Sequence, residues 1–312
     1  MPGPYAHITL LNELMYTERL KSIFSPLSEF PKILETDFQF CSMGAVSPDY
    51  PNLDRRNMSA SLWADAMHCT NACQMITSGV KRVRNSKGAT RNKQLAWLLG
   101  YCSHVVADVT IHPIVQAKVG PYAENQRQHR ICEMNQDSYI FRRANRGNIG
   151  ESNNYEFNIS RCSELNNAFQ LDDDIVTLWN GMFEDIHPQL FVSNPPDSVL
   201  WHREFVLKVD SDCSNGNQHL FPLARVIAAK LGMDYPRFEE VDHQFVAKLV
   251  VPSEIPIIMH YDKIFDLAAG NVAAMWKVVE EMIEDNNSTN LHIQGEWNLD
   301  TGCDEHGRLV FW

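Results

Sequence analysis

The segment HVVADVTIHP, residues 104–113, places His104, Asp108 and His112 four residues apart in an otherwise apolar stretch. Each four-residue step along a helix of 3.6 residues per turn rotates by about 40°, so the three side chains line one stripe. The preceding residues, LAWLLGYCS, are apolar enough to lie in a core. Burying a carboxylate and two imidazoles there is costly, and a metal ion is the usual compensation. The segment therefore predicts a buried metal-binding helix.

Other candidate ligands lie in the same half of the chain. HRICE places His129 and Glu133 four residues apart, WADAMH ends in His68, and GAVSPDYPNLD carries Asp49 in a proline-rich loop. His7 lies near the start of another helical segment. Two or three ligands on one helix face converge without distortion. Taken singly, each has an ordinary alternative: a hydrogen-bonded core histidine, an exposed ion pair or a turn aspartate.

Composition narrows the function classes. The 312 residues carry a formal net charge of −12, which argues against a surface that binds nucleic acid by neutralising phosphates. The N-terminus lacks the basic and apolar regions of a secretory signal, and no apolar run approaches the roughly 18 residues of a membrane span. The eight cysteines form no CxxC pair and are interpreted as mostly reduced thiols, although Cys69 and Cys73, four residues apart on a predicted helix, could suit a zinc site. We expect a cytoplasmic protein without a transmembrane segment, with export by a route that needs no N-terminal signal as the alternative.

Helical periodicity dominates the chain and predicts an all-α fold. Strand signals are scarce, because Pro252 and Pro256 interrupt the β-branched run AKLVVPSEIPIIM. Residues 80–91 and 146–160 are predicted to form polar loops. The predicted helices cover residues 7–24, 59–79, 92–108 with a continuation toward 118, 125–145, 172–185, 198–211, 218–232, 238–249 and 261–284.

The order and helical setting of these ligands resemble the zinc-dependent phospholipase C family, which is related to glycosylphosphatidylinositol phospholipase D and shares its fold with P1-type nucleases. The resemblance covers residues 5–145 by motif and the later helices by pattern. It implies a multi-helix bundle with a clustered site of two to three zinc ions. One domain is expected over residues 1–312, with ligand helices in 1–145, packing helices in 160–285 and an irregular tail in 286–312.

The family pattern assigns the candidate ligands to three zinc ions. The first would be held by Asp49, His68, His104 and Asp108. The second would be held by His112, His129 and Glu133. The third would be held by His7 and by Asp108, which bridges two metals. Asp49 also matches the position of the family's proposed general base.

Two departures from the family pattern concern the ligands. The central motif is H-x3-D-x3-H, as in the phospholipase D relatives, whereas the secreted phosphatidylcholine enzymes have H-x3-D-x5-H. Those enzymes also bind the third zinc through a processed N-terminal residue. Here Met1 precedes the small residue Pro2, so removal of Met1 would free the Pro2 amine as a ligand. Intact-mass measurement showing Met1 fully retained would contradict this hypothesis.

The resemblance and the metal chemistry imply hydrolysis of a phosphodiester, with diacylglycerol and a phosphorylated headgroup as products of a phospholipid. Asp49 would accept a proton from the attacking water or orient it. Phe, Met and Tyr residues near 40–60 and 120–145 are expected to form an apolar lip for lipid, with peripheral membrane contact; burial in the core is the alternative. A P1-like nuclease or phosphomonoesterase, and a non-catalytic zinc-stabilised interaction protein, remain as alternative functions.

Overall fold

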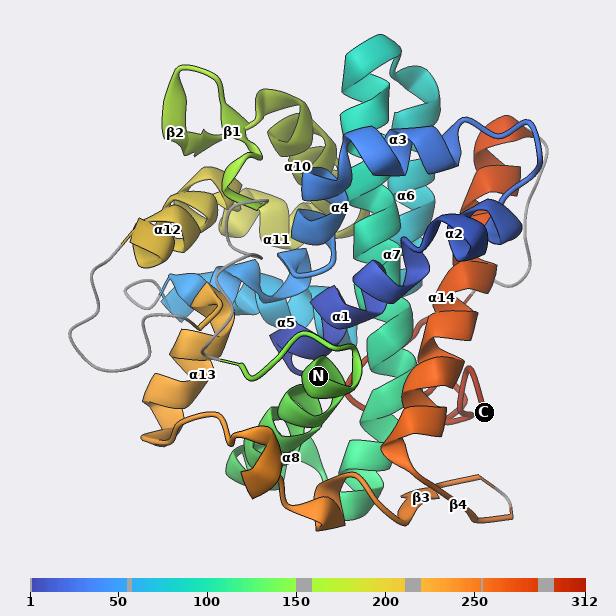
Figure 1. Cartoon of the computed structure of the whole chain (residues 1–312). Coiled ribbons are helices and arrows are strands. Elements are labelled where there is room, and N and C mark those ends of the chain that lie inside the picture. Colours follow the sequence, from blue (N-terminus) through green and yellow to red (C-terminus); the bar gives the residue numbers. More distant parts are fainter. Residues whose placement is uncertain (1, 55–57, 150–158, 211–219, 254, 286–294) are drawn as a thin grey trace.

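The computed structural model describes residues 2–54, 58–149, 159–210, 220–253, 255–285 and 295–312. Helices dominate these residues, which confirms the all-α class (Figure 1). The strands in the described ranges form two short antiparallel hairpins. The first pairs β1 (Ser163–Glu164) with β2 (Asn167–Leu171), and the second pairs β3 (Leu249–Val251) with β4 (Ile257–Met259).

The helix α7 (Gly88–Val119) is the central element of the bundle. It is buried from Gln94 to Val115 because its residues are apolar on nearly every face. In Figure 1 it runs through the middle of the molecule, with α1 (Pro4–Leu14) crossing in front and α14 (Tyr261–Glu284) alongside. Among the described helices, α7 alone is long and apolar enough to cross a membrane, and its apolar window is completely buried in the bundle.

The elements of the N-terminal half surround α7 on several sides. They are α2 (Thr17–Ile23), α3 (Phe30–Thr36), α4 (Phe38–Gly44), the 3-10 helices η1 (Ser47–Leu53) and η2 (Met58–Ala60), α5 (Ser61–Cys69), α6 (Ala72–Asn85) and α8 (Tyr122–Arg143). The crossing of α4 over α7 is close, because a Cβ at Gly44 would meet the backbone of Trp97, and one at Gly100 would meet the backbone of Cys41. Glycine at both positions is what lets the two backbones approach.

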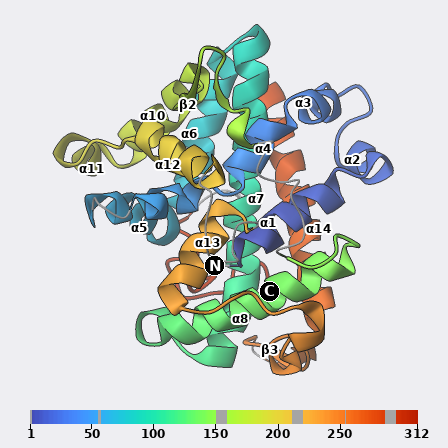
Figure 2. The same cartoon turned by 60° about the vertical axis from the view of Figure 1, so that its left-hand side comes forward.

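The C-terminal half covers the flanks of the bundle. Its elements are α10 (Asp173–Ile186), α11 (Pro188–Ser193), α12 (Ser198–Asp210), α13 (Pro222–Leu231), η3 (Phe238–Glu240), η4 (His243–Phe245) and α14. Figure 2 shows that α8 and α13 lie beside the start of α1. Residues 295–312 form turns and isolated bridges without a helix, as predicted for the tail. The part of the predicted tail from 286 to 294 lies outside the described residues.

Several predicted helix boundaries are wrong. The predicted helix 59–79 is two helices, because the chain breaks between Cys69 and Ala72, with Asn71 in a left-handed conformation at φ 55°. The predicted loop 80–91 is mostly helical, since α6 continues to Asn85 and α7 begins at Gly88. The predicted helix 7–24 is interrupted between α1 and α2. Breaks of this kind depend on single turn residues, and a periodic pattern of apolar residues over a longer window does not reveal them.

The predicted helix 238–249 is also wrong. This segment contains η3, η4 and the start of β3, with Lys248 in a left-handed conformation at φ 54°. The run that follows was expected to form no strand because of its prolines. Both prolines lie outside the strands, however, in the connection between β3 and β4, where no ladder hydrogen bond is needed.

The described cysteines are free thiols, in agreement with the predicted reduced state; Cys213 lies outside the described residues. Cys69 and Cys73, which a zinc site could have used, end α5 and begin α6. Burial raises the pKa of each of these two thiols to about 12. Their surroundings therefore disfavour the thiolate, which is the form that binds zinc.

Candidate metal centre

The predicted ligand stripe lies on the buried face of α7. The side chains of His104 and Asp108 are fully buried, and that of His112 is 1% exposed. Their four-residue spacing keeps them on one side of the helix, as the sequence predicts. An ionised carboxylate in such an interior requires compensation by an opposite charge. The residues around Asp108 therefore determine whether this stripe can bind a metal ion.

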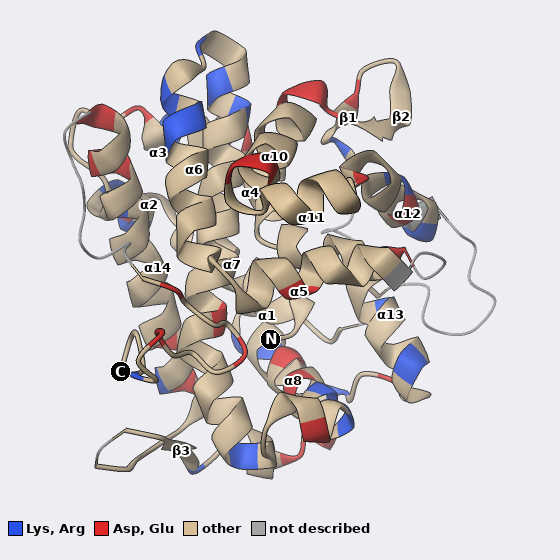
Figure 3. Cartoon of the chain, turned by 180° about the vertical axis from the view of Figure 1, so that it is seen from behind, with Lys and Arg blue, Asp and Glu red and all other residues tan. Residues whose placement is uncertain are grey.

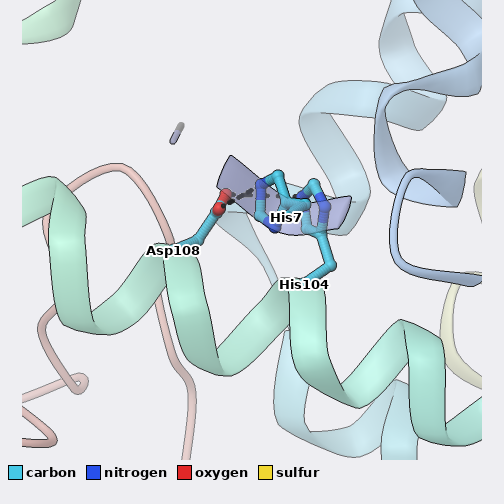
Figure 4. A group of neighbouring side chains, drawn as sticks. All are labelled: His7, His104 and Asp108. Carbon is cyan, nitrogen blue, oxygen red and sulfur yellow. Dashed lines mark ion pairs between the residues drawn. The ribbon is translucent and has the colours of Figure 1, made fainter. Parts of the chain in front are cut away.

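Three residues from two helices converge on one point. His7 on α1 reaches across to α7, and its Nε2 lies 3.2 Å from Asp108 Oδ1 (Figure 4). The His7 ring stacks on the His104 ring, with centroids 4.1 Å apart and planes 10° apart. One ligand atom from each of His7, His104 and Asp108 lies within 4.8 Å of the other two. The crossing of α1 over α7 thus assembles a His–His–Asp set from residues about 100 positions apart.

His68 on α5 joins the same cluster. Its Nε2 lies 3.3 Å from His104 Nε2 and 3.8 Å from Asp108 Oδ2. The Nδ1 atom of His68 lies 2.7 Å from the Ala64 carbonyl, and that of His104 lies 2.9 Å from the Ala45 carbonyl. A carbonyl only accepts, so both Nδ1 atoms must donate. Both Nε2 lone pairs then face one another, an arrangement that a shared cation stabilises.

The donor set fits a zinc ion. Both ring nitrogens of His7 and both carboxylate oxygens of Asp108 are buried and have no hydrogen-bond partner in the described part of the chain. Imidazole nitrogens and a carboxylate are ligands that zinc prefers, and ligand imidazoles usually donate their second nitrogen to a backbone carbonyl or carboxylate. His68 and His104 show that second contact. Apart from the ion pairs between the imidazoles and Asp108, the buried and convergent ligand atoms of His7 and Asp108 have no partner among the described residues, as a metal site requires.

The electrostatics of the cluster follow from burial and from its internal charges. Burial and the neighbouring His104 lower the pKa of His7. Burial opposes protonation of His104 as well, but the Asp108 carboxylate outweighs it and raises the pKa of His104. Burial would raise the pKa of Asp108, yet His104 and His7 hold it well below its ordinary value. Asp108 is therefore an anion near neutral pH and attracts a cation.

The predicted second ligand set lies farther along α7 and on α8. The His112 and His129 rings are 6.4 Å apart, and His129 and Glu133 are buried. His112 Nδ1 donates to the Leu299 carbonyl at 2.5 Å, and His129 Nε2 donates to the Gly120 carbonyl at 2.6 Å. The remaining nitrogen of each ring is buried without a partner among the described residues.

Glu133, the third member of this set, forms an ion pair with Arg130 at 2.9 Å. Burial would raise the pKa of Glu133, but nearby positive charges, including Arg130, hold it below its ordinary value. The described ligand atoms that meet within 4.8 Å of one another belong to the first cluster and not to this set. The structure therefore brings the three residues near one another without closing them around one point.

Asp49 lies on η1 and borders a cavity of about 110 Å³. It is buried, its Oδ1 lies 3.5 Å from Asn52 Nδ2, and its charge acts on both His7 and His104. Pro2 borders the same cavity. Met1 lies outside the described residues, so the role of a free Pro2 amine stays a prediction.

The apolar wall of this cavity differs from the predicted lip. Phe40, Met43 and Tyr50, which belong to the predicted lip, are buried in the core. The cavity is lined instead by α13, together with Tyr122 and Arg130 of α8; the α13 residues are Leu223, Val226, Ile227, Lys230 and Leu231. Burial in the core, the alternative to the lip, is correct for these three residues, because the apolar faces of α4 and η1 pack inward.

Asp137 on α8 was missed by the sequence reasoning. It lies four residues after Glu133 and continues the stripe of His129 and Glu133. Its carboxylate accepts from the backbone N–H groups of Tyr5 at 3.3 Å and Ala6 at 2.8 Å, and so caps the N-terminus of α1. The repeated four-residue spacing was the available signal. Asp137 thereby fixes the helix that carries His7.

A comparison with protein families gives a match over more than half of the chain. The family model described as zinc dependent phospholipase C matches residues 6–188. This range contains each of the eight predicted ligands and leaves out α12 to α14 and the tail. Comparisons with curated proteins and with solved structures find no match.

Proposed function

Because the chain belongs to the zinc-dependent phospholipase C family, we propose that it hydrolyses phospholipids at the phosphodiester bond on the glycerol side. The products would be diacylglycerol and a phosphorylated headgroup. The family supports a zinc-dependent hydrolase of phospholipase C type. The headgroup, the products and the number of zinc ions are our proposals.

The observation that carries the proposal is the cluster of His7, His104 and Asp108. Its ligand atoms are buried and convergent, and those of His7 and Asp108 have no hydrogen-bond partner in the described structure. A purely structural zinc site is separated from solvent and leaves no position for a substrate. The neighbours of this cluster border open space: Asp49 lines one cavity, and His68, whose Nε2 lies 3.3 Å from His104 Nε2, lines another. Access of this kind supports catalysis over a purely structural role.

We assign the ligands as the resemblance implies, with two or three zinc ions. One ion would be held by Asp49, His68, His104 and Asp108. Another would be held by His112, His129 and Glu133. A third would be held by His7 and Asp108. The close approach of the His68 and His104 imidazoles to Asp108 supports the first assignment, and that of the His7 imidazole supports the third.

The chain's own residues position the reactants. When bound, zinc polarises phosphoryl oxygens, lowers the pKa of a bound water and offsets developing negative charge. Asp49 accepts one proton of the attacking water while the water oxygen bonds to phosphorus. The bond from phosphorus to the glycerol oxygen breaks, and that oxygen leaves with a proton from solvent. Asn52, 3.5 Å from Asp49, orients the carboxylate for this transfer.

The cavity provides separate surfaces for the two ends of a lipid substrate. Leu223, Val226 and Ile227 of α13 form an apolar wall, which suits the glycerol and acyl portion. Arg130 borders this cavity and also the neighbouring one that contains His68, and it donates to Tyr122 Oη at 3.1 Å. Its guanidinium group, which also forms the ion pair with Glu133, is placed to attract an anionic phosphate. Peripheral contact with a lipid surface at the cavity mouth follows from this arrangement.

The nuclease alternative receives less support. Figure 3 shows Lys and Arg gathered where α6 ends and α7 begins, which is about 30 Å along α7 from Asp108. Several of these cations are paired with carboxylates: Arg82 with Asp185, Arg91 with Glu29, and Lys93 with Asp172 and Asp174. Paired cations so far from the cluster do not form a phosphate-binding lining for it.

The test is ³¹P NMR of the zinc-loaded protein with phosphatidylcholine in mixed micelles. The wild-type chain is expected to release phosphocholine. The double variant His104→Ala/Asp108→Ala is expected to release none, because it lacks two ligands of the central cluster. Glu184→Gln, an exposed change on α10, serves as the matched control and should retain wild-type turnover.

Other products would change the proposal in defined ways. Phosphatidic acid in place of phosphocholine would move the cleaved bond to the headgroup side. An unchanged spectrum from protein shown to carry zinc would contradict cleavage of phosphatidylcholine. The same assay with phosphatidylinositol would then decide whether another headgroup is used.

A further inference from the structure

The C-terminal strap, which we define as residues 297–303, contacts the predicted zinc ligands although it lies beyond the range of the family match. Figure 3 shows the chain end passing over the rear of the bundle near α7 and α14. Trp297 and Leu299 are buried. This segment contains no helix and no paired strands, yet it is buried against a ligand helix. Specific contacts therefore hold it there.

Leu299 connects two ligand-bearing helices through its backbone. Its N–H donates to the carbonyl of His68 on α5 at 2.7 Å. Its carbonyl accepts from His112 Nδ1 on α7 at 2.5 Å. One strap residue thus contacts a predicted ligand of the first zinc and a predicted ligand of the second. Any displacement of Leu299 would act on both.

The contact to His112 determines which nitrogen can bind a metal. Because Nδ1 donates its proton to Leu299, the lone pair lies on Nε2. His112 Nε2 is buried and has no hydrogen-bond partner among the residues that the structure describes. His68 and His104 have the same arrangement, with Ala64 and Ala45 as the accepting carbonyls. Leu299 therefore completes a pattern that the other α5 and α7 imidazoles already show.

Close packing fixes the strap on α7. Gly302 has φ 68°, and a Cβ there would collide with Pro113 and with the Val109 carbonyl. Gly302 N donates to the Asn298 carbonyl at 2.9 Å, which closes the turn that contains Leu299. The strap residue Asp300 borders the cavity that also contains His68 and Arg130. The strap is thus seated at one defined position.

We propose that the C-terminal strap is a positioning element of the zinc centre. Leu299 orients His112 for coordination through Nε2, and the seated strap is required for full zinc affinity at the set of His112, His129 and Glu133. This inference rests on the zinc centre assigned under the proposed function. It adds a role for a segment that lies outside the matched family range.

The experiment compares Gly302→Ala with Gly307→Ala. Both glycines have positive φ, at 68° and 75°, so both substitutions introduce the same kind of backbone strain. Only Gly302→Ala also pushes the strap away from α7, because a Cβ at Gly307 meets open space. Zinc affinity is measured by competition with a chromophoric chelator. We expect Gly302→Ala to weaken binding of one zinc by about 10- to 100-fold, and Gly307→Ala to match the wild type.

A second measurement needs no strap variant and so does not depend on how Gly302→Ala folds. Long-range ¹H–¹⁵N NMR of the zinc-loaded wild-type chain, with His112→Asn used to assign the signal, reports the state of each ring nitrogen. We expect His112 to carry a proton on Nδ1 and to coordinate through Nε2. Coordination through Nδ1, or equal zinc affinity in both glycine variants, would overturn the proposal.

Neither readout uses turnover, which separates this inference from the proposed function. If zinc binding depends on the strap but the chain cleaves no phospholipid, the positioning role of the strap is supported and the proposed phospholipase function is contradicted. If the chain hydrolyses phospholipid but zinc binding does not depend on the strap, the proposed function is supported and the positioning role of the strap is contradicted.

Discussion

Asp108 is buried between the imidazoles of His7, His68 and His104, with its oxygens 3.2–3.8 Å from their Nε2 atoms. It is the residue that joins α1 and α5 electrostatically to α7. A carboxylate without a cation would be strongly unfavourable at this position. We therefore expect metal binding at this candidate centre to depend on Asp108 more than on any single histidine.

Asp108→Asn is expected to retain the fold and lose zinc, because the amide matches the carboxylate in shape but carries no charge. Changes to residues that support metal ligands cost about 10- to 100-fold in affinity, so loss of a ligand should cost about 100-fold or more. Competition with a chelator measures the zinc affinity. Glu184→Gln, which makes the same change from carboxylate to amide at an exposed position, is the control. Wild-type affinity in Asp108→Asn would contradict the assignment of Asp108.

Asp137 supports a prediction on pH. Burial raises the pKa of Asp137 well above its ordinary value, although the N–H groups of Ala6 and Tyr5 oppose the shift. An acid with a higher pKa in the folded chain stabilises the fold at low pH. That contribution is lost as the pH rises from the unfolded value of about 3.9 toward the folded value.

Asp137→Asn removes this titration. The difference in unfolding free energy, wild type minus variant, should therefore decrease with rising pH above about 4, with a limiting slope of about 1.4 kcal/mol per unit. Urea unfolding of the zinc-free proteins at several pH values measures it. Parallel pH profiles for the two chains would show that Asp137 titrates normally.

The sequence correctly predicted that His104, Asp108 and His112 share one buried helix face, because helical periodicity fixes the direction of their side chains. Their role as zinc ligands stays a prediction. His7 has no such local pattern; its helical setting made it a candidate, and the resemblance assigned it to a zinc ion. The Leu299 carbonyl could not have been identified, because it is a backbone atom that meets a histidine 187 positions away in sequence.

At the scale of elements, the crossing of α4 and α7 positions His104. Gly44 and Gly100 allow the two helices to touch through their backbones. The Ala45 carbonyl, directly after α4, then reaches His104 Nδ1 at 2.9 Å. The spacing between two helices thus fixes the tautomer of a predicted zinc ligand.

Gly100→Ala should destabilise the chain by about 2–3 kcal/mol, since the added methyl group must push one backbone away from the other. The matched control is Gly270→Ala on the exposed face of α14, where a Cβ meets open space. That change should stabilise the chain by about 0.5–1 kcal/mol, because alanine favours the helix. Denaturant unfolding compares the two. Equal stability of both variants would mean that the crossing tolerates a side chain.

The success of element prediction depended on uninterrupted periodicity. The helix predicted at 261–284 has those bounds in the structure, because its apolar stripe of Phe265, Ala269, Val272, Met275 and Val279 is buried throughout. Prediction failed where one residue in a left-handed conformation ends an element, as at Asn71 and Lys248. Asparagine adopts this conformation more readily than most residues, but the pattern of apolar residues does not reveal it.

At the scale of the whole molecule, we propose that the chain forms one domain. Buried apolar side chains from Tyr5 to Leu299 belong to one connected core. The ligand-bearing helices, the later helices and the strap all contribute to it. The predicted metal centre lies within this core, and metal binding should therefore stabilise the whole fold.

Zinc removal is expected to lower the melting temperature of the whole chain. With free zinc at about 100 times its dissociation constant, binding contributes about 2.7 kcal/mol, which corresponds to a shift of roughly 5 °C. Scanning calorimetry before and after dialysis against a chelator measures it. The double variant His104→Ala/Asp108→Ala should show a smaller shift; equal shifts in both proteins would place the stabilising zinc elsewhere.

The most direct test of the central claim is anomalous X-ray diffraction from crystals of the zinc-loaded protein, collected on both sides of the zinc absorption edge. We predict an anomalous peak among the side chains of His7, His104 and Asp108 that disappears below the edge. The absence of any peak at this cluster, in crystals that contain zinc by fluorescence, would contradict the assignment of the metal centre.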